Sequence, residues 1–234
     1  MLVLALDTTT RGGSCAVIRE GTVLSEIATD PARSHDAQLP AALMTVLERA
    51  GVALAQIDVY AVATGPGSFT GLRVGIAAMQ GLAFAAEKPL IGISAFDALA
   101  AHARASQPPA HAEFVATWID AWRGEVYAAL YQDAREVESP SVEPPATLLA
   151  RYAGRGGRYL FVGEAVPVYR SAIAETIGTN AWVADPVAPP LAGRIAFMAA
   201  DVARAGHRPH PHAIRPLYVR RPDAELARDA RPVH

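Results

Sequence analysis

The sequence predicts an α/β fold built of two lobes, each with a mixed β-sheet and covering helices. The first observation is a continuous apolar segment, residues 2–6, which is typical of a central strand buried on both faces. The second is the alternation of strand-like and helix-like segments through the first half of the chain. The third is that this pattern begins again after a proline-containing break at residues 106–110.

The first half predicts the order β-β-β-α-β-α-β-α. Segments 15–19 and 22–27 are rich in β-branched residues and flank a Glu-Gly turn, which predicts a hairpin. The remaining expected elements are a helix over 35–50, a strand over 59–63, a helix over 71–86, a strand over 90–93 and a helix to about residue 105. Ser94 and Asp97 resemble a capping box at the start of the last helix. This order is the topology of the ribonuclease-H-like fold.

The second half predicts a smaller lobe of the same kind. The expected elements are strands over 114–119, 126–131 and 159–162, and helices over 166–177 and 191–205. Two ribonuclease-H-like lobes without detectable sequence repetition are the design of the actin-like ATPase superfamily. We therefore expect a first lobe over 1–106, a second lobe over 111–220 and a C-terminal tail over 221–234.

Composition excludes several classes of protein. A hydrophobic content of 51% is too high for a disordered chain. The single cysteine, Cys15, excludes a disulfide framework and a cysteine-based zinc site, and it fits a reducing compartment. A net charge of −2 gives no reason to expect nucleic-acid binding by the chain alone. No basic segment precedes the N-terminal apolar run, and Arg73 interrupts the run at 71–86, so we expect a soluble cytoplasmic protein without a membrane span.

The turn after the first strand contains Asp7, Thr8 and Thr9. In two-lobed actin-like enzymes an aspartate and hydroxyl groups at this turn hold a metal-bound phosphate. The alternative is that these side chains cap the turn through hydrogen bonds to its backbone, which is the commoner arrangement and the one we favour.

A second turn is rich in glycine and contains Gly65, Gly67 and Ser68. Free N–H groups in such a turn, at the start of a helix, can bind an anion. The segment lacks the Gly-Lys-Ser/Thr of a phosphate-binding loop, and close backbone packing explains the glycines equally directly. We favour packing and keep a vestigial nucleotide site, made of Asp7 and the two turns, as the alternative.

The helix over 71–86 is apolar almost all round, which is typical of a core helix or of a subunit interface. Small residues recur along one stripe, where they would allow close approach of another helix. We favour an interface, with the helix over 35–50 as its neighbour. The predicted partner-binding residues are His35, Leu39, Leu43, Gly71, Leu72, Gly75, Ala78, Met79 and Leu82.

Several segments together resemble the TsaB family over nearly the whole chain. The specific ones are residues 65–75, with the sequence GPGSFTGLRVG, and residues 123–127, with the sequence RGEVY. Residues 4–9, 81–83, 89–94 and 216–220 and the isolated His35 also match. The resemblance implies a subunit of the bacterial machinery that makes threonylcarbamoyladenosine in tRNA.

The same resemblance implies that this chain is not the catalytic subunit. The related catalytic protein, TsaD, holds a metal through a His-x-Glu-Gly-His motif, and the two histidine positions fall on Ala95 and Leu99 here. ATP and a divalent metal would then belong to the partners, a TsaD-like subunit and a TsaE-like ATPase, with no cofactor in the isolated chain. Contact with tRNA would occur only through the complex, and the isolated chain could form a homodimer.

We therefore expect a non-catalytic dimerisation subunit. The alternative from another class is a stand-alone ATPase or phosphotransferase of the actin-like superfamily, which would depend on Asp7 and on the glycine-rich turn. No Gly-x-Ser-x-Gly motif supports a hydrolase nucleophile. His207, His210 and His212 alternate with prolines and are expected to face solvent.

Overall fold

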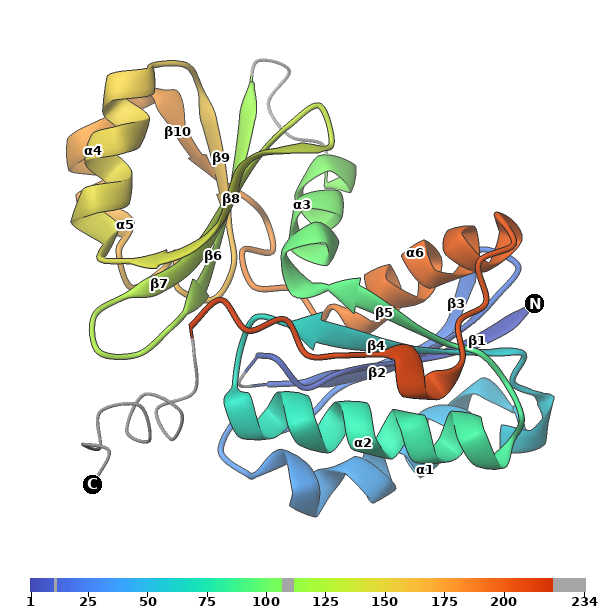
Figure 1. Cartoon of the computed structure of the whole chain (residues 1–234). Helices are drawn as coiled ribbons and strands as arrows, with labels where there is room; N and C mark the ends of the chain where they lie inside the picture. Colours follow the sequence, from blue (N-terminus) through green and yellow to red (C-terminus); the bar gives the residue numbers. More distant parts are fainter. Residues whose placement is uncertain (11, 107–111, 221–234) are drawn as a thin grey trace, which may run out of the picture.

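The first lobe is a mixed sheet with its first strand at the centre (Figure 1). The computed structural model describes residues 1–10, 12–106 and 112–220, apart from the side chains of residues 35 and 36. The elements of this lobe are β1 (Leu2–Asp7), β2 (Ser14–Arg19), β3 (Thr22–Ala28), α1 (His35–Ala50), β4 (Val59–Gly65), α2 (Phe69–Ala85), β5 (Leu90–Ser94) and α3 (Ala95–Ala105). β1 pairs antiparallel with β2 and parallel with β4, in the sheet order β3-β2-β1-β4-β5. The predicted order of elements is confirmed.

β1 reads as a continuous apolar run because helices cover both faces of its sheet. All six of its residues are buried. Leu4 and Leu6 belong to the cluster beneath α1 and α2, whereas Val3 and Ala5 belong to the cluster on the opposite face. A strand covered on both sides buries every side chain, so the alternation of polar and apolar residues disappears.

The second lobe repeats the arrangement of the first. Its elements are β6 (Phe114–Asp120), β7 (Val126–Gln132), β8 (Arg135–Glu143), α4 (Pro145–Arg155), β9 (Tyr159–Val162), α5 (Arg170–Ile177) and β10 (Ala181–Val183). In both sheets an antiparallel three-stranded meander is continued by two parallel strands, here in the order β10-β9-β6-β7-β8. The predicted architecture of two lobes, each built on a mixed sheet of the same order, is therefore confirmed.

Three elements of the second lobe escape the sequence pattern. β8 is an edge strand with partly exposed, charged residues, so it lacks an apolar run. α4 begins at the second of two consecutive prolines, and β10 has only three residues. α5 begins at Arg170 rather than at the predicted residue 166, because a series of turns occupies the intervening positions.

The last helix, α6 (Ala192–Arg204), packs against the first lobe although it follows the second in sequence. It lies across β1, β2 and β4 on the face opposite α1 and α2. Ser14 of β2 holds its start, because the Ser14 hydroxyl accepts hydrogen bonds from the amides of Leu191 and Ala192 at 3.1 and 3.0 Å. The expected second lobe, 111–220, therefore includes a helix that completes the first lobe, because α6 covers a sheet face that would otherwise be open.

Residues 207–220, which we call the C-terminal strap, run from α6 back over the first lobe to the second (Figure 1). Gln80 of α2 donates to the carbonyl oxygens of Pro211 and Ile214, at 3.0 and 3.3 Å. The amide of Leu217 donates to the carbonyl of Thr64 at the end of β4, at 2.7 Å. The strap thus ties α2, β4 and the second lobe together.

The structure contains three short 3₁₀ turns in the described residues, at Leu54–Gln56, Gly178–Asn180 and Pro211–Ala213. The predicted tail, 221–234, and most of the predicted linker lie outside the described residues. Within the described part of the chain, none of the helices has the length and apolar character needed to cross a bilayer.

Candidate functional site

The turn after β1 is held together by its own side chains. Asp7 is buried, and its Oδ1 accepts hydrogen bonds from the amide and the hydroxyl of Thr9, at 2.8 and 2.6 Å. The hydroxyl of Thr10 donates to Oδ2 at 3.2 Å. The Thr8 hydroxyl donates to the carbonyl of Gly71 at 2.7 Å and so fixes the start of α2 to this turn. The geometry is that of a capped turn.

The glycine-rich turn packs directly onto the first turn. A β-carbon on Gly67 would lie 2.7 Å from the carbonyl carbon of Thr9, and one on Gly65 would lie 2.9 Å from the carbonyl oxygen of Leu217. The Ser68 amide donates to the Thr9 carbonyl at 3.0 Å, and the Ser68 hydroxyl caps α2 by accepting from the amide of Gly71 at 3.2 Å. The glycines thus permit close backbone contact.

The six residues of the predicted vestigial nucleotide site therefore do lie together at the carboxyl ends of β1 and β4. Their polar groups form hydrogen bonds within the turns. The Asp7 carboxylate accepts from Thr9 and Thr10, whereas Ser68 donates its amide to the Thr9 carbonyl and accepts from the Gly71 amide at the start of α2. The arrangement supports the packing explanation for these residues.

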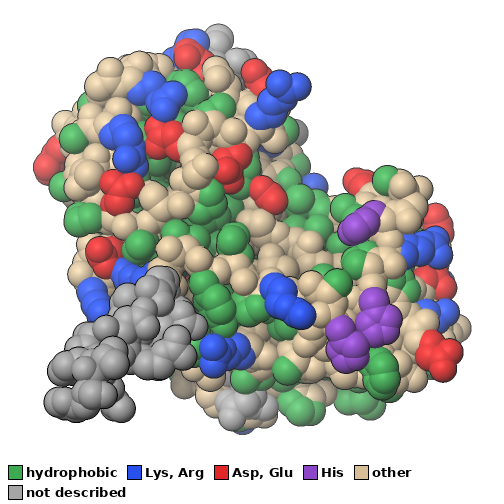
Figure 2. Space-filling view, viewed as in Figure 1, with side chains coloured by type: hydrophobic (Ala, Val, Ile, Leu, Met, Phe, Trp, Pro, Cys, Tyr) green, Lys and Arg blue, Asp and Glu red, His purple; other side chains and the backbone are tan. Residues whose placement is uncertain are grey.

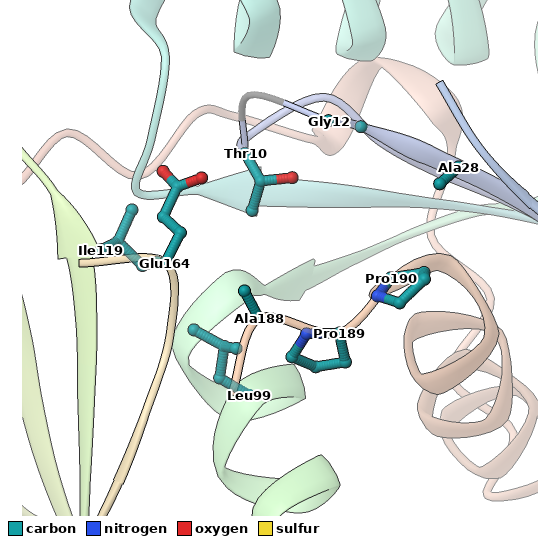
Figure 3. A pocket seen from close by; sticks show the side chains of 10 residues that line it. Thr10, Gly12, Ala28, Leu99, Ile119, Glu164, Ala188, Pro189 and Pro190 are labelled. Carbon is teal, nitrogen blue, oxygen red and sulfur yellow. The ribbon is translucent and has the colours of Figure 1, made fainter. Parts of the chain in front are cut away.

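A cavity lies beside these turns, between the two lobes (Figure 3). Thr10 and Gly12 line it from the first lobe, Ile119 and Glu164 from the second, and Leu99 from α3. Its volume is about 140 Å³, compared with the roughly 300–1,000 Å³ of typical small-molecule sites. In this closed arrangement the cavity is smaller than a nucleotide would need.

The two positions at which the resemblance implied that metal-binding histidines are replaced lie in the core. Ala95 and Leu99 are both buried on α3, and neither side chain has a donor atom. Within the described part of the chain, no group of three or more His, Cys, Asp or Glu side chains could hold a metal ion. His210 and His212 are exposed on the strap and pack beside the ring of Phe84.

Four of the residues predicted for the α2 interface lie on the buried side of the helix. Gly71, Leu72, Gly75 and Met79 pack inside the first lobe. A β-carbon on Gly75 would collide with the Thr8 hydroxyl and lie 3.2 Å from the Thr8 β-carbon. These small residues let α2 approach the turn after β1, rather than a second protein.

Two of the residues predicted for the interface on α1 also face inward. Leu39 is buried on the inner side of α1, and Leu43 is half-buried against the hydrophobic cluster between this helix and the first sheet. Met44, by contrast, has 69% of its surface exposed. His35 is the first residue of α1, and its side chain lies outside the described part of the structure.

The exposed side of the two helices forms an apolar surface that we call the α1–α2 face. Its members are Met44, Ala77, Ala78, Gly81, Leu82 and Ala85. Of the predicted residues, Ala78 and Leu82 lie on this face and remain partly accessible. Figure 2 shows hydrophobic side chains along the lower edge of the molecule, where α1 and α2 lie in Figure 1. No group in the chain covers Gly81, since a β-carbon there would have no heavy atom within 4 Å among the described residues.

Two segments that are distant in sequence meet at the second lobe. Arg220 at the end of the strap donates to the carbonyl of Ala121 at 3.0 Å and forms an ion pair with Glu125. Its guanidinium also lies 5.8 Å from the centre of the Tyr127 ring. The β6–β7 turn is thereby fixed to the strap, a relationship that no local sequence pattern predicts.

The family model, the sequence relatives and the solved structure that resemble this chain all point to the same group of proteins. The family model "TsaD: tRNA N6-adenosine threonylcarbamoyltransferase" matches residues 22–228. The tRNA threonylcarbamoyladenosine biosynthesis protein TsaB of Escherichia coli is 36% identical over 168 residues, which are 70% of this chain and 71% of that protein. The TsaB of Bacillus subtilis is 27% identical over 231 residues, 96% of each chain. The structure of YeaZ from Pseudomonas aeruginosa is 30% identical, with a TM-score of 0.75 over 93% of this chain and 99% of that one.

Proposed function

The chain belongs to the TsaB family of tRNA threonylcarbamoyladenosine biosynthesis proteins, and we propose that it is a non-catalytic subunit that binds a TsaD-like catalytic protein. Its role in the biosynthesis of threonylcarbamoyladenosine follows from the family. The single observation that carries the binding role is the exposed glycine near the C-terminal end of α2, Gly81.

The described part of the chain gives no structural reason for a glycine at position 81. Its φ angle is not positive, and no atom among the described residues would hinder a side chain there. Glycine within an exposed helix costs about 1 kcal/mol of stability relative to alanine. A partner that packs closely against the α2 backbone would require the absence of a side chain at this position.

The neighbours of Gly81 support the same partner-binding role. Ala77, Ala78 and Ala85 are one turn, or nearly one turn, away on the same side of α2, and each presents only a methyl group. Small side chains allow two helices to pack at the short end of the roughly 8–10 Å range of interaxial distances. Leu82 on the same helix and Met44 on α1 are larger apolar side chains that remain accessible, as apolar interface residues must be before a partner binds. The proposed contact is therefore helix against helix.

The non-catalytic role is supported by the residues in the catalytic positions. Ala95 and Leu99 cannot bind a metal ion, and the carboxylate of Asp7 serves its own turn. We therefore assign ATP and the divalent metal to the partner subunits, a TsaD-like protein and a TsaE-like ATPase. With a net charge of −2, the chain is proposed to meet tRNA only through the complex, in the cytoplasm.

The binding test uses two charged substitutions on the α1–α2 face, Gly81→Arg and Ala77→Arg. Each should weaken binding of the TsaD-like subunit from the same organism by about thirtyfold or more, because the guanidinium would be buried without a partner. Isothermal titration calorimetry measures the affinity, and circular dichroism checks that each variant remains folded. Multi-angle light scattering of the isolated chain would also show whether it forms a homodimer, and the same measurement on the two variants would show whether this face supports it.

Ala174→Arg is the matched control, because Ala174 is exposed on α5 in the other lobe. It should leave the affinity unchanged. Full binding by both variants on α2 would contradict the proposed face. Binding lost equally in the control would show that the added charge, rather than its position, is responsible.

The stand-alone ATPase remains the competing function, since Asp7 and the glycine-rich turn lie together beside the interlobe cavity. Calorimetry of the isolated chain with ATP and magnesium should show no micromolar binding and no turnover. Tight binding with hydrolysis would replace the proposed role by this one.

A further inference from the structure

A surface hollow unrelated to the α1–α2 face lies beside α3, where the helix is flanked by the second sheet and by α6. Four of its lining residues come from one side of α3: Asp97, Ala100, Ala101 and Arg104. Tyr131 of β7 and Met198 of α6 form its walls. The volume is about 290 Å³, nearly twice the roughly 150 Å³ that accommodates a benzene molecule.

Arg104 brings a positive charge into this hollow. Its Nε and Nη2 atoms are shielded from solvent and have no hydrogen-bond acceptor among the described residues. A guanidinium is charged at every physiological pH and has five N–H groups in a fixed fork. Shielded donors of this kind are costly to leave unpaired, so the fork is suited to a carboxylate of a ligand.

Asp97 brings a negative charge to the other end of the hollow. It precedes Arg104 by seven residues, which places the two on one side of α3 about 10 Å apart along its axis. The Tyr131 hydroxyl donates to Asp97 Oδ1 at 2.7 Å and so fixes the carboxylate in position. Burial, followed by the charge of Asp97, raises the pKa of Tyr131, so this hydroxyl keeps its proton.

Between the two charged residues, α3 contributes only methyl groups to the lining of the hollow. Ala100 and Ala101 lie one turn from each charged residue. Arg104 lines the same hollow as these alanines and Asp97. Even so, no hydrogen bond or ion pair joins Arg104 to Asp97 in the described part of the chain.

We propose that this hollow binds a small zwitterion of the α-amino acid class, with its carboxylate on Arg104 and its ammonium group at Asp97. A simple anion fits less well, because Asp97 and the nearby Glu136 would repel it. The two carboxylates are close enough to interact, since burial and then the charge of Asp97 raise the pKa of Glu136. A simple cation would leave Arg104 unpaired. The proposal is independent of the proposed binding of a catalytic subunit.

The test uses the full chain with its methionines labelled by ¹³C in the methyl group. A panel of L-α-amino acids is titrated at millimolar concentrations, and the methyl signals are followed by NMR. At least one amino acid should shift the signal of Met198, which lines the hollow, while the exposed Met44 on α1 stays unchanged. For each binder, the N-acetyl derivative and the amide, which lack the ammonium and the carboxylate charge, should bind about tenfold more weakly or worse.

Two substitutions locate the site. Arg104→Met and Asp97→Asn should each weaken binding by about tenfold or more, and Asp97→Asn retains an oxygen that can accept from Tyr131. Arg170→Met, at an exposed arginine on α5, is the control and should leave the titration unchanged.

Three results would overturn the proposal: no shift of Met198 with any amino acid, equal binding of the N-acetyl derivatives, or binding unaffected by both substitutions. Should Arg104→Met fail to fold, Asp97→Asn and the two derivatives decide the outcome alone.

Discussion

The backbone carbonyl of Thr9 fills the space in which the β-carbon of any other residue at position 67 would lie, because its carbonyl carbon is 2.7 Å from that point. The two turns at the ends of β1 and β4 are therefore in direct backbone contact. Gly67→Ala should lower the free energy of unfolding by about 2 kcal/mol or more, since backbone rather than a flexible side chain must move. Urea unfolding followed by circular dichroism measures this change.

Gly81→Ala is the contrasting substitution in the neighbouring helix. Nothing among the described residues hinders a β-carbon there, and alanine is the better helix former. The free energy of unfolding should therefore rise by about 0.5–1 kcal/mol. If Gly67→Ala lowered the free energy of unfolding no more than Gly81→Ala does, the contact with Thr9 would not require a glycine at position 67.

The start of α6 should depend on Ser14 of β2. Ser14→Ala removes the acceptor for the buried amides of Leu191 and Ala192, and we expect a loss of about 2 kcal/mol in the free energy of unfolding. Ser171→Ala, at an exposed position on α5, should change it by no more than about 0.5 kcal/mol. Both values come from urea unfolding, and an effect of Ser14→Ala as small as the control would contradict this role.

The ion pair of Arg220 with Glu125 should couple the strap to the second lobe. A double-mutant cycle with Arg220→Met and Glu125→Gln should give a coupling free energy of about 1–2 kcal/mol, because both groups are partly shielded. The exposed pair Arg204–Asp201 on α6 is the matched control, expected at about 0.3 kcal/mol. Equal coupling in the two cycles would mean that Arg220 is only a surface charge.

Cys15 should be unreactive in the folded protein. Burial, and then the charge of Asp7, raises its pKa from 9.0 to about 12. At pH 8 the thiolate fraction is then about a thousandfold lower than in the unfolded chain. Reaction with a disulfide reagent in native buffer and in urea measures the difference.

The same shift predicts a loss of stability in alkali. The thiol is protonated in both states below pH 9, and the unfolded state loses its proton first as the pH rises from 9 toward 12. The stability that Cys15 contributes through its raised pKa is therefore lost over this range, and Cys15→Ala should remove that part of the pH dependence. Rapid labelling of Cys15 in native buffer would contradict both expectations.

Much of the first lobe is predictable because its elements have local signatures. β1 is a short apolar run, and α1 ends at Gly51, whose φ of 62° is the left-handed conformation of a helix stop. β8 and β10 lack such signatures, since an edge strand is half exposed and a three-residue strand has no period. The predicted capping box at Ser94 forms only in part. The Ser94 hydroxyl accepts from the Phe96 amide, whereas the Asp97 carboxylate accepts from the Tyr131 hydroxyl.

The residues of the candidate binding face could not be predicted from the sequence for a different reason. An all-apolar α2 indicates two buried sides, but it does not tell which residues face the chain's own sheet. Gly75 and Gly81 look alike in sequence, yet one lies against Thr8 and the other against open space. The distinction depends on where β1 ends, which is a long-range contact.

By itself, the sequence determined the order of the elements in the first lobe, the repetition of the lobe, and the lack of donor atoms at Ala95 and Leu99. These properties depend on neighbours a few residues apart, whose spacing is set by helix and strand geometry. Only the tertiary structure decided that α6 returns to the first sheet, that α2 turns Gly81 outward, and that Arg104 shares a hollow with Tyr131. Those relations arise because strand pairing and packing bring together residues that local periodicity leaves independent.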